Sequence, residues 1–87
     1  MDTRVYTRGR SLIVKHSVIV IGHKTSISLE KPFWDGVKGI ASERDMTLSD
    51  LISKVENERT HGNLSSALRL FVLDHYKVLA ERGMIAA

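Results

Sequence analysis

Apolar and polar residues alternate in one short stretch of the chain, and this alternation predicts a strand with two different faces. One face carries Thr25, Ile27 and Leu29, and the other carries Lys24, Ser26 and Ser28. A short strand alone leaves its backbone donors and acceptors unpaired. Nothing later in the chain resembles a partner strand, so we expect the same segment of a second copy to pair with it across a two-fold axis.

The residues before this strand leave two alternatives open. Leu12 to Ile21 is rich in β-branched residues and is expected to be extended. Gly22 then interrupts the run, either as a bulge within a continuing strand or within a hairpin turn at positions 22–24. We favour the bulge, because the hairpin would give the alternating strand a partner from its own chain and weaken the argument for a dimer.

Helical periodicity predicts three helices after the strand. The first runs from Pro32 to Arg44, since proline suits a first turn. The second runs from Leu48 to Arg59 with Thr47 as its N-cap, and the third runs from Leu64 to Glu81 with Asn63 as its N-cap. These elements predict a mainly helical protein with a short β-ribbon.

Two further features of the helices indicate close packing. Gly36 and Gly39 weaken the first helix by roughly 1 kcal/mol each relative to alanine, and they permit another backbone to approach closely. In the third helix, Leu70, Leu73 and Val78 lie off the main apolar stripe. The third helix is therefore expected to be buried between neighbours or in a dimer.

The positive charge is concentrated near the N-terminus. The chain has 87 residues and a net charge of +3. Residues 1–24 carry five basic side chains and one acidic one, giving +4, whereas the remaining eight basic and nine acidic side chains give −1. We expect a basic flexible arm over residues 1–16, a domain over residues 17–83 and a tail over residues 84–87. A basic arm beside a polar ribbon suits a polyanionic partner, although a solvated arm serving solubility is an equal alternative.

Several classes of protein find little support in the sequence. Cysteine is absent, and no apolar run approaches the roughly 20 residues that span a bilayer. The histidines at positions 16, 23, 61 and 75 match no compact ligand motif, so we expect no metal and no cofactor. No nucleophile elbow, glycine-rich phosphate loop or paired-carboxylate signature is present, so we expect no enzyme.

The ordered set of motifs resembles the ribbon-helix-helix superfamily of DNA-binding proteins, of the Arc and methionine-repressor type. It is most similar to a bacterial group with an extra C-terminal helix. The resemblance covers roughly residues 17–77. It rests on the segment His23 to Glu30, the aromatic pair Phe33-Trp34 and the segment Asn63 to Leu73.

The resemblance implies an obligate, intertwined homodimer whose two strands form an intersubunit antiparallel ribbon above the helices. It places the DNA base contacts at Lys24, Ser26 and Ser28. Phosphate contacts are expected from Thr47, Leu48 and Ser49 at the second predicted helix, where free N–H groups attract anions, and from Arg8, Arg10 and Lys15. The dimer core is expected to contain Ile27, Leu29, Trp34, Val37 and Ile52.

These expectations lead to a cytoplasmic, homodimeric regulator of transcription, a repressor that binds double-stranded DNA. Two of the three base-contacting positions are serine, a short residue with little preference among bases, so sequence discrimination is expected to be modest. The third helix could extend the dimer core, build a tetramer on DNA or bind another protein. The alternative function is therefore a protein-interaction module, such as an antitoxin, that binds its partner through the third helix.

Overall fold

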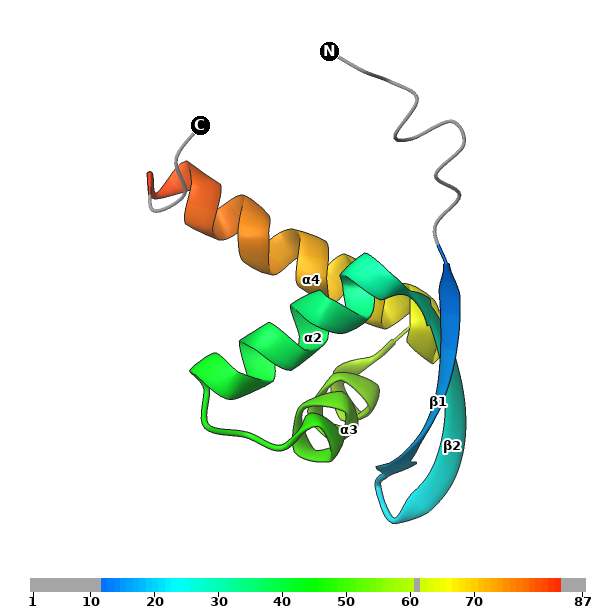
Figure 1. Ribbon diagram of the computed structural model, residues 1–87. Coiled ribbons are helices and arrows are strands. Elements are labelled where there is room, and N and C mark those ends of the chain that lie inside the picture. The colour runs from blue at the N-terminus through cyan, green and yellow to red at the C-terminus, as the bar shows by residue number, and fades with distance from the viewer. Residues whose placement is uncertain (1–11, 61, 84–87) are drawn as a thin grey trace.

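The computed structural model describes residues 12–60 and 62–83, which form a two-stranded antiparallel sheet followed by three helices (Figure 1). The elements are β1 (Ile13–Val20), β2 (His23–Glu30), α2 (Lys31–Glu43), α3 (Leu48–Glu58) and α4 (Leu64–Glu81). The mainly helical class with a short ribbon and a third helix is confirmed, and each helix boundary lies within one residue of its prediction. None of the helices in this part of the chain combines the length and apolar composition needed to cross a membrane.

β1 and β2 form a hairpin within one chain, so the predicted bulge at Gly22 is wrong. The alternative hairpin is observed, but its turn lies one residue earlier than the expected positions 22–24. Val20 pairs with His23, which leaves Ile21 and Gly22 as the two turn residues. Their φ angles are 47° and 79°. Positive φ at both positions is typical of a type I′ turn, whose twist matches that of the paired strands. The alternating strand therefore finds its first partner in β1.

The outer edge of β2 is open. Lys31 N–H donates to the Leu12 carbonyl at 2.9 Å and continues the ladder between the two strands. Backbone groups of alternate residues point to opposite sides of a strand, so those of Lys24, Ser26 and Ser28 point away from β1. No described residue forms a hydrogen bond with them.

The outer edge of β1 is partly occupied by α3. Ile21 N–H donates to Ser53 Oγ at 3.0 Å, and Ser49 Oγ donates to the Ile19 carbonyl. These two serines are four residues apart and therefore lie on the same face of α3. Near the turn, α3 thus satisfies edge groups of β1, whereas β2 has no such cover.

Side-chain caps begin α3 and α4, as the sequence predicted. Thr47 Oγ1 accepts a hydrogen bond from Asp50 N–H at 3.0 Å. Asn63 Oδ1 accepts one from Ser66 N–H at 2.8 Å. Each cap satisfies a backbone donor that the first turn of a helix leaves without a partner.

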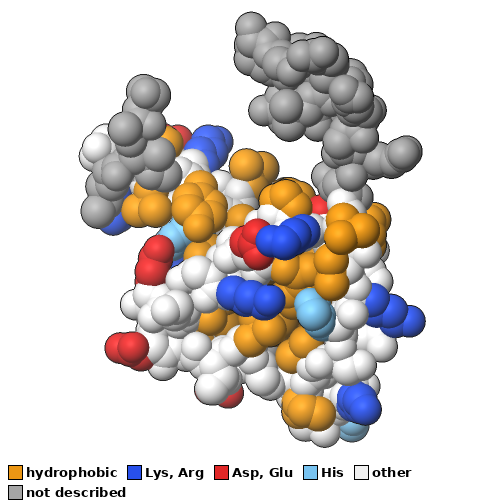
Figure 2. Space-filling view, in the orientation of Figure 1, with side chains coloured by type: hydrophobic (Ala, Val, Ile, Leu, Met, Phe, Trp, Pro, Cys, Tyr) orange, Lys and Arg blue, Asp and Glu red, His pale blue; other side chains and the backbone are white. Residues whose placement is uncertain are grey.

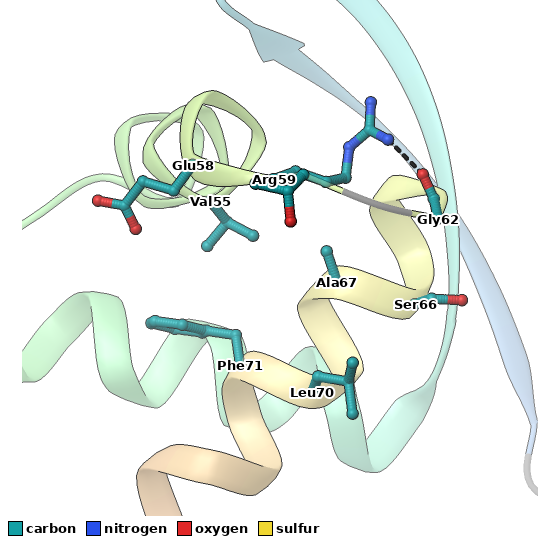
Figure 3. A pocket seen from close by; sticks show the side chains of 9 residues that line it. Val55, Glu58, Arg59, Gly62, Ser66, Ala67, Leu70 and Phe71 are labelled. Carbon is teal, nitrogen blue, oxygen red and sulfur yellow. Dashed lines mark hydrogen bonds between the residues drawn. The ribbon is translucent and has the colours of Figure 1, made fainter.

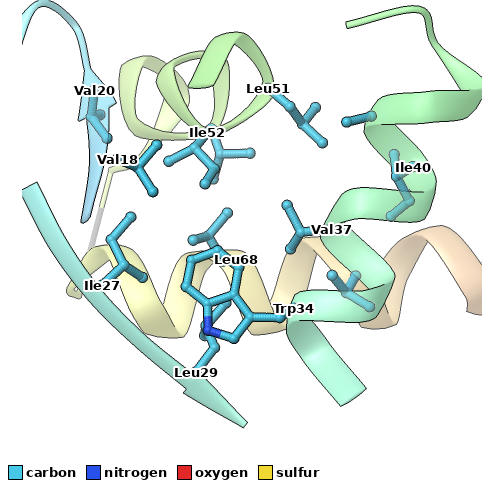
Figure 4. Packing of buried hydrophobic residues seen from close by; sticks show 13 residues of the cluster. Val18, Val20, Ile27, Leu29, Trp34, Val37, Ile40, Leu51, Ile52 and Leu68 are labelled. Atoms are coloured by element: carbon cyan, nitrogen blue, oxygen red, sulfur yellow. The ribbon is translucent and has the colours of Figure 1, made fainter. Parts of the chain in front are cut away.

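A single apolar core fills the space between the sheet and the three helices (Figure 4). α3 packs against β1, and α4 packs against β2, α2 and α3. The fully buried side chains with the largest volumes are Trp34, Leu29, Ile40, Leu51, Ile52, Leu68 and Val37. α4 thus completes the core inside one chain, through Leu68 and Val72.

α2 and α4 approach each other closely at Gly36. A Cβ atom added there would lie 2.7 Å from Val72 Cγ1, which is inside van der Waals contact. Val72 is 6% exposed and β-branched, so it has little room to move. At Gly39, by contrast, an added Cβ would meet only Tyr76 Oη at 3.9 Å. The two glycines therefore have different roles.

Gly36→Ala and Gly39→Ala are expected to change the free energy of unfolding in opposite directions. Alanine favours a helix over glycine by about 1 kcal/mol. Gly39→Ala should therefore stabilise the protein by about 0.5–1 kcal/mol. Gly36→Ala gains the same amount but overpacks the core, so it should destabilise by about 1 kcal/mol overall. Urea unfolding of both variants measures the difference, and equal shifts of the same sign would contradict the close approach.

Candidate nucleic-acid interface

The outward face of the hairpin is the surface that the sequence singled out on β2. Lys24, Ser26 and Ser28 are exposed, whereas Ile27 and Leu29 are 2% and 0% exposed. The predicted division of β2 into a polar outer face and an apolar inner face is confirmed. Contact of the three polar residues with DNA stays a prediction.

β1 adds polar residues to this face that sequence reasoning did not place there. In the observed register Lys15 lies opposite Ser28, and Ser17 lies opposite Ser26. Directly opposed residues of antiparallel strands project from the same face. Ser17 was not among the predicted contacts. Lys15 was a predicted phosphate contact that fell both in the extended run from Leu12 to Ile21 and in the arm assigned to residues 1–16, and it lies in β1. Placing these two residues on the outward face requires the register of the hairpin, which the sequence left open.

The outward face carries positive charge. Neither Lys15 nor Lys24 forms an ion pair with a described residue. In Figure 2 the acidic side chains lie mainly over the helices, and lysine or arginine side chains lie along the hairpin side. The surface therefore suits an anionic ligand.

The acidic residue at the end of β2 is tied to α4. Arg69 Nε and Nη2 donate to the two carboxylate oxygens of Glu30 at 2.8 and 3.2 Å. These hydrogen bonds hold the pKa of the Glu30 carboxyl below its usual value. The pair compensates the negative charge of Glu30 and fixes the start of α2 against α4.

The N-terminus of α3 lies at the edge of β1, where Ser49 bonds the Ile19 carbonyl. Its two hydroxyl groups have partners within the chain, since Thr47 caps the helix and Ser49 bonds the Ile19 carbonyl. Leu48 packs against the apolar core. The groups left for an anion are the backbone N–H groups of the first turn. A phosphate contact here stays a prediction and would use the backbone of Leu48 and Ser49.

Other predicted sites fall into two groups. Arg8, Arg10 and His61 lie outside the described residues. The predicted dimer-core residues are all buried within one chain: Ile27, Leu29, Trp34, Val37 and Ile52. Their burial confirms that they are core residues, and their contact with a second copy stays a prediction.

The remaining histidines do not gather into a metal site. The rings of His16 and Trp34 pack edge to face, with centroids 4.8 Å apart. His75 Nε2 lies 3.4 Å from Glu43 Oε1, without hydrogen-bond geometry. Over residues 12–60 and 62–83 no group of three or more histidine, aspartate or glutamate side chains could hold a metal ion.

Comparison with known proteins places this geometry in a family. Residues 13–76 match the model of the ribbon-helix-helix domain. No curated protein sequence matches the chain significantly. A solved structure, that of an uncharacterized protein from Bordetella pertussis Tohama I, is 31% identical with a TM-score of 0.71. That similarity covers 98% of this chain and 74% of the Bordetella chain. With a two-stranded ribbon, two capped helices and a family match over most of its length, the chain belongs to the ribbon-helix-helix domain family.

Proposed function

We propose that the chain is a DNA-binding regulator of transcription, a cytoplasmic repressor that reads the major groove as a homodimer. The family commonly contains DNA-binding regulators and antitoxins. The observation that carries the proposal is the exposed polar row of Lys24, Ser26 and Ser28 on a basic outward face. Lysine and serine side chains donate or accept hydrogen bonds at base edges, and a β-ribbon fits into the major groove.

The open edge of β2 supports pairing between two copies. An antiparallel pair centred on Ser26 would place Lys24 of each chain opposite Ser28 of the other. The backbone groups of these three residues would then all find partners. The partly occupied edge of β1 favours β2 as the pairing edge. The intersubunit ribbon would thus form the centre of a four-stranded sheet rather than a sheet of two strands.

A four-stranded sheet divides the DNA contacts between its inner and outer strands. Neighbouring strands lie about 4.8 Å apart, so the two β1 strands would be about 14 Å apart. The major groove is about 12 Å wide. The β2 pair would therefore face the base edges, and the β1 strands would face the phosphates on both sides. Lys15 on β1 has the charge for that position, and Arg8 and Arg10 are proposed as further phosphate contacts.

Replacing Lys24, Ser26 and Ser28 together with alanine should abolish specific binding and leave the protein folded. Losing three contacts from each chain should raise the dissociation constant for specific DNA at least 100-fold, since each good base contact contributes about 1–3 kcal/mol. The measurement is a fluorescence-anisotropy titration against DNA upstream of the protein's own gene and against a scrambled sequence, at two salt concentrations.

The matched control is Lys38→Ala/Ser42→Ala on the exposed side of α2, which removes the same positive charge away from the hairpin. It should bind the upstream DNA like the original protein. Specific binding that survives in the triple variant would refute the ribbon as the reading surface. Equal binding of both DNA sequences by the original protein, with a steep salt dependence, would instead indicate nonspecific binding.

One observation favours a second candidate function, an interaction module such as an antitoxin. Leu70 and Leu73 on α4 are 65% and 60% exposed. Large apolar side chains that share an exposed face often mark a protein-binding surface. In this reading α4 binds another protein, and DNA binding is secondary or absent.

A further inference from the structure

α4 has apolar residues on two opposite sides. At 100° per residue, Leu68 and Leu73 are separated by 140° around the helix. Leu68 and Val72 lie on the inner side and are 0% and 6% exposed. The outer side carries Leu70 and Leu73, which are 65% and 60% exposed. We call these two residues the outer stripe of α4.

The second half of α4 gains little from the core of its own chain. No residue of α4 beyond Val72 is buried, although the helix continues to Glu81. Short helical segments are marginal in water without packing. The outer stripe begins beside this poorly packed half, so a partner on the stripe would stabilise it.

A recess of about 440 Å³ joins the outer stripe to α3. In Figure 3, Val55 of α3 and Phe71 of α4 point toward one another across the recess, and Leu70 lies on its α4 side. The Arg59 side chain forms an ion pair with Glu56 at 2.7 Å. Arg59 also lines this recess and so separates it from the next one.

The adjacent recess leads from Arg59 to the turn end of the hairpin. It has a volume of about 430 Å³ and is lined by residues of both strands, Val20 and Thr25 among them, and by Leu64 at the start of α4. α4 packs against β2, whereas α3 packs against β1. α4 therefore lies on the side of the molecule where the open edge of β2 is found.

We infer that a second copy of this chain covers the outer stripe of α4. The inference rests on the proposed dimer, because a copy paired with the open edge of β2 is placed on the side where α4 lies. α3 occupies part of the alternative edge, through Ser49 and Ser53, which directs the copy to β2. A two-fold axis then brings the same stripe of both chains into one interface. Leu70 and Leu73 anchor it.

Leu70→Asp and Leu73→Asp test the stripe. Sedimentation velocity across a range of protein concentrations should give a dimer for the original chain. Each variant should raise the dimer dissociation constant roughly 30-fold or more, as loss of an interface anchor does. Circular dichroism should show intact helices, because the inner side of α4 is unchanged. Leu12→Asp is the matched control, since Leu12 is 67% exposed and receives the same charge outside α4.

A cysteine placed in the stripe tests the contact directly. The chain has no cysteine of its own, so Leu73→Cys introduces a single thiol per chain. A short bismaleimide should cross-link two copies of this variant, and it should not cross-link Lys54→Cys, a control on the exposed side of α3.

Three outcomes would overturn the inference. The first is an original chain that is monomeric at about 100 µM. The second is unchanged dimerisation of both aspartate variants of α4. The third is a Leu12→Asp variant whose dimer is weakened as much as theirs. Unchanged dimerisation would leave the stripe free for another protein. The DNA titration tests the proposed function independently of the dimer interface. A chain that binds no DNA but dimerises through Leu70 and Leu73 would refute the proposed function and support the inference.

Discussion

Replacing Ile27 with aspartate is expected to unfold the protein at neutral pH. Ile27 is 2% exposed and projects from β2 into the core between the sheet and the helices (Figure 4). The variant loses the burial of an apolar side chain and places a carboxylate where no buried polar group is available to pair with it. The substitution should lower the free energy of unfolding by about 4 kcal/mol or more. A domain of this size has a free energy of unfolding of roughly 4–13 kcal/mol, so much of its stability would be lost.

The matched control for this substitution lies one residue away on the same strand. Ser26 is exposed on the outward face, so Ser26→Asp adds the same charge without burying it. It should keep the free energy of unfolding within about 0.5 kcal/mol of the original value. Circular dichroism and urea unfolding measure both variants. A folded Ile27→Asp monomer would argue against the buried position of Ile27 and against the intersubunit ribbon.

Replacing Trp34 with alanine is expected to have the second largest effect. Trp34 is 1% exposed and lies at the centre of the core. Its indole Nε1 donates a hydrogen bond to the Val14 carbonyl at 2.8 Å, and its ring packs against His16. Trp34 thus connects α2 to β1 as well as filling the core. Deleting the side chain should cost about 3–5 kcal/mol in the free energy of unfolding.

Trp34→Phe separates the two contributions of the indole. Phenylalanine keeps much of the apolar contact and removes the donor to Val14, whose carbonyl belongs to a residue paired within the ladder. The expected loss is about 1–2 kcal/mol, clearly smaller than for alanine. Urea unfolding compares the two variants. Equal losses would mean that the hydrogen bond, rather than the volume of the ring, holds α2 against the hairpin.

The parts of the fold that local signals determine could be predicted from the sequence. Alternation placed Ile27 and Leu29 inside and Lys24 outside, because a strand has a period of two. Thr47 and Asn63 marked two helix starts, because their side chains satisfy the orphan donors of a first turn. These features depend on neighbouring residues only.

The hairpin could not be predicted in the same way, because its turn violates the local preference. Isoleucine is β-branched and rarely adopts positive φ, so Ile21-Gly22 lacks the usual signature of a two-residue turn. The Ile21 N–H is held by Ser53, a residue 32 positions away. Tertiary contacts therefore decide this turn, and the register that brings Lys15 and Ser17 to the outward face follows from it.

The two serines of α3 also limit how the protein can assemble. A sheet with two equally open edges can add strands at both sides and grow into a cross-β aggregate. Ser49 and Ser53 occupy part of one edge, so in the proposed dimer strand addition through β2 would end when two chains have met. Pairing of this kind would be self-limiting. A small protein could then keep an unpaired strand edge at high concentration without forming fibres.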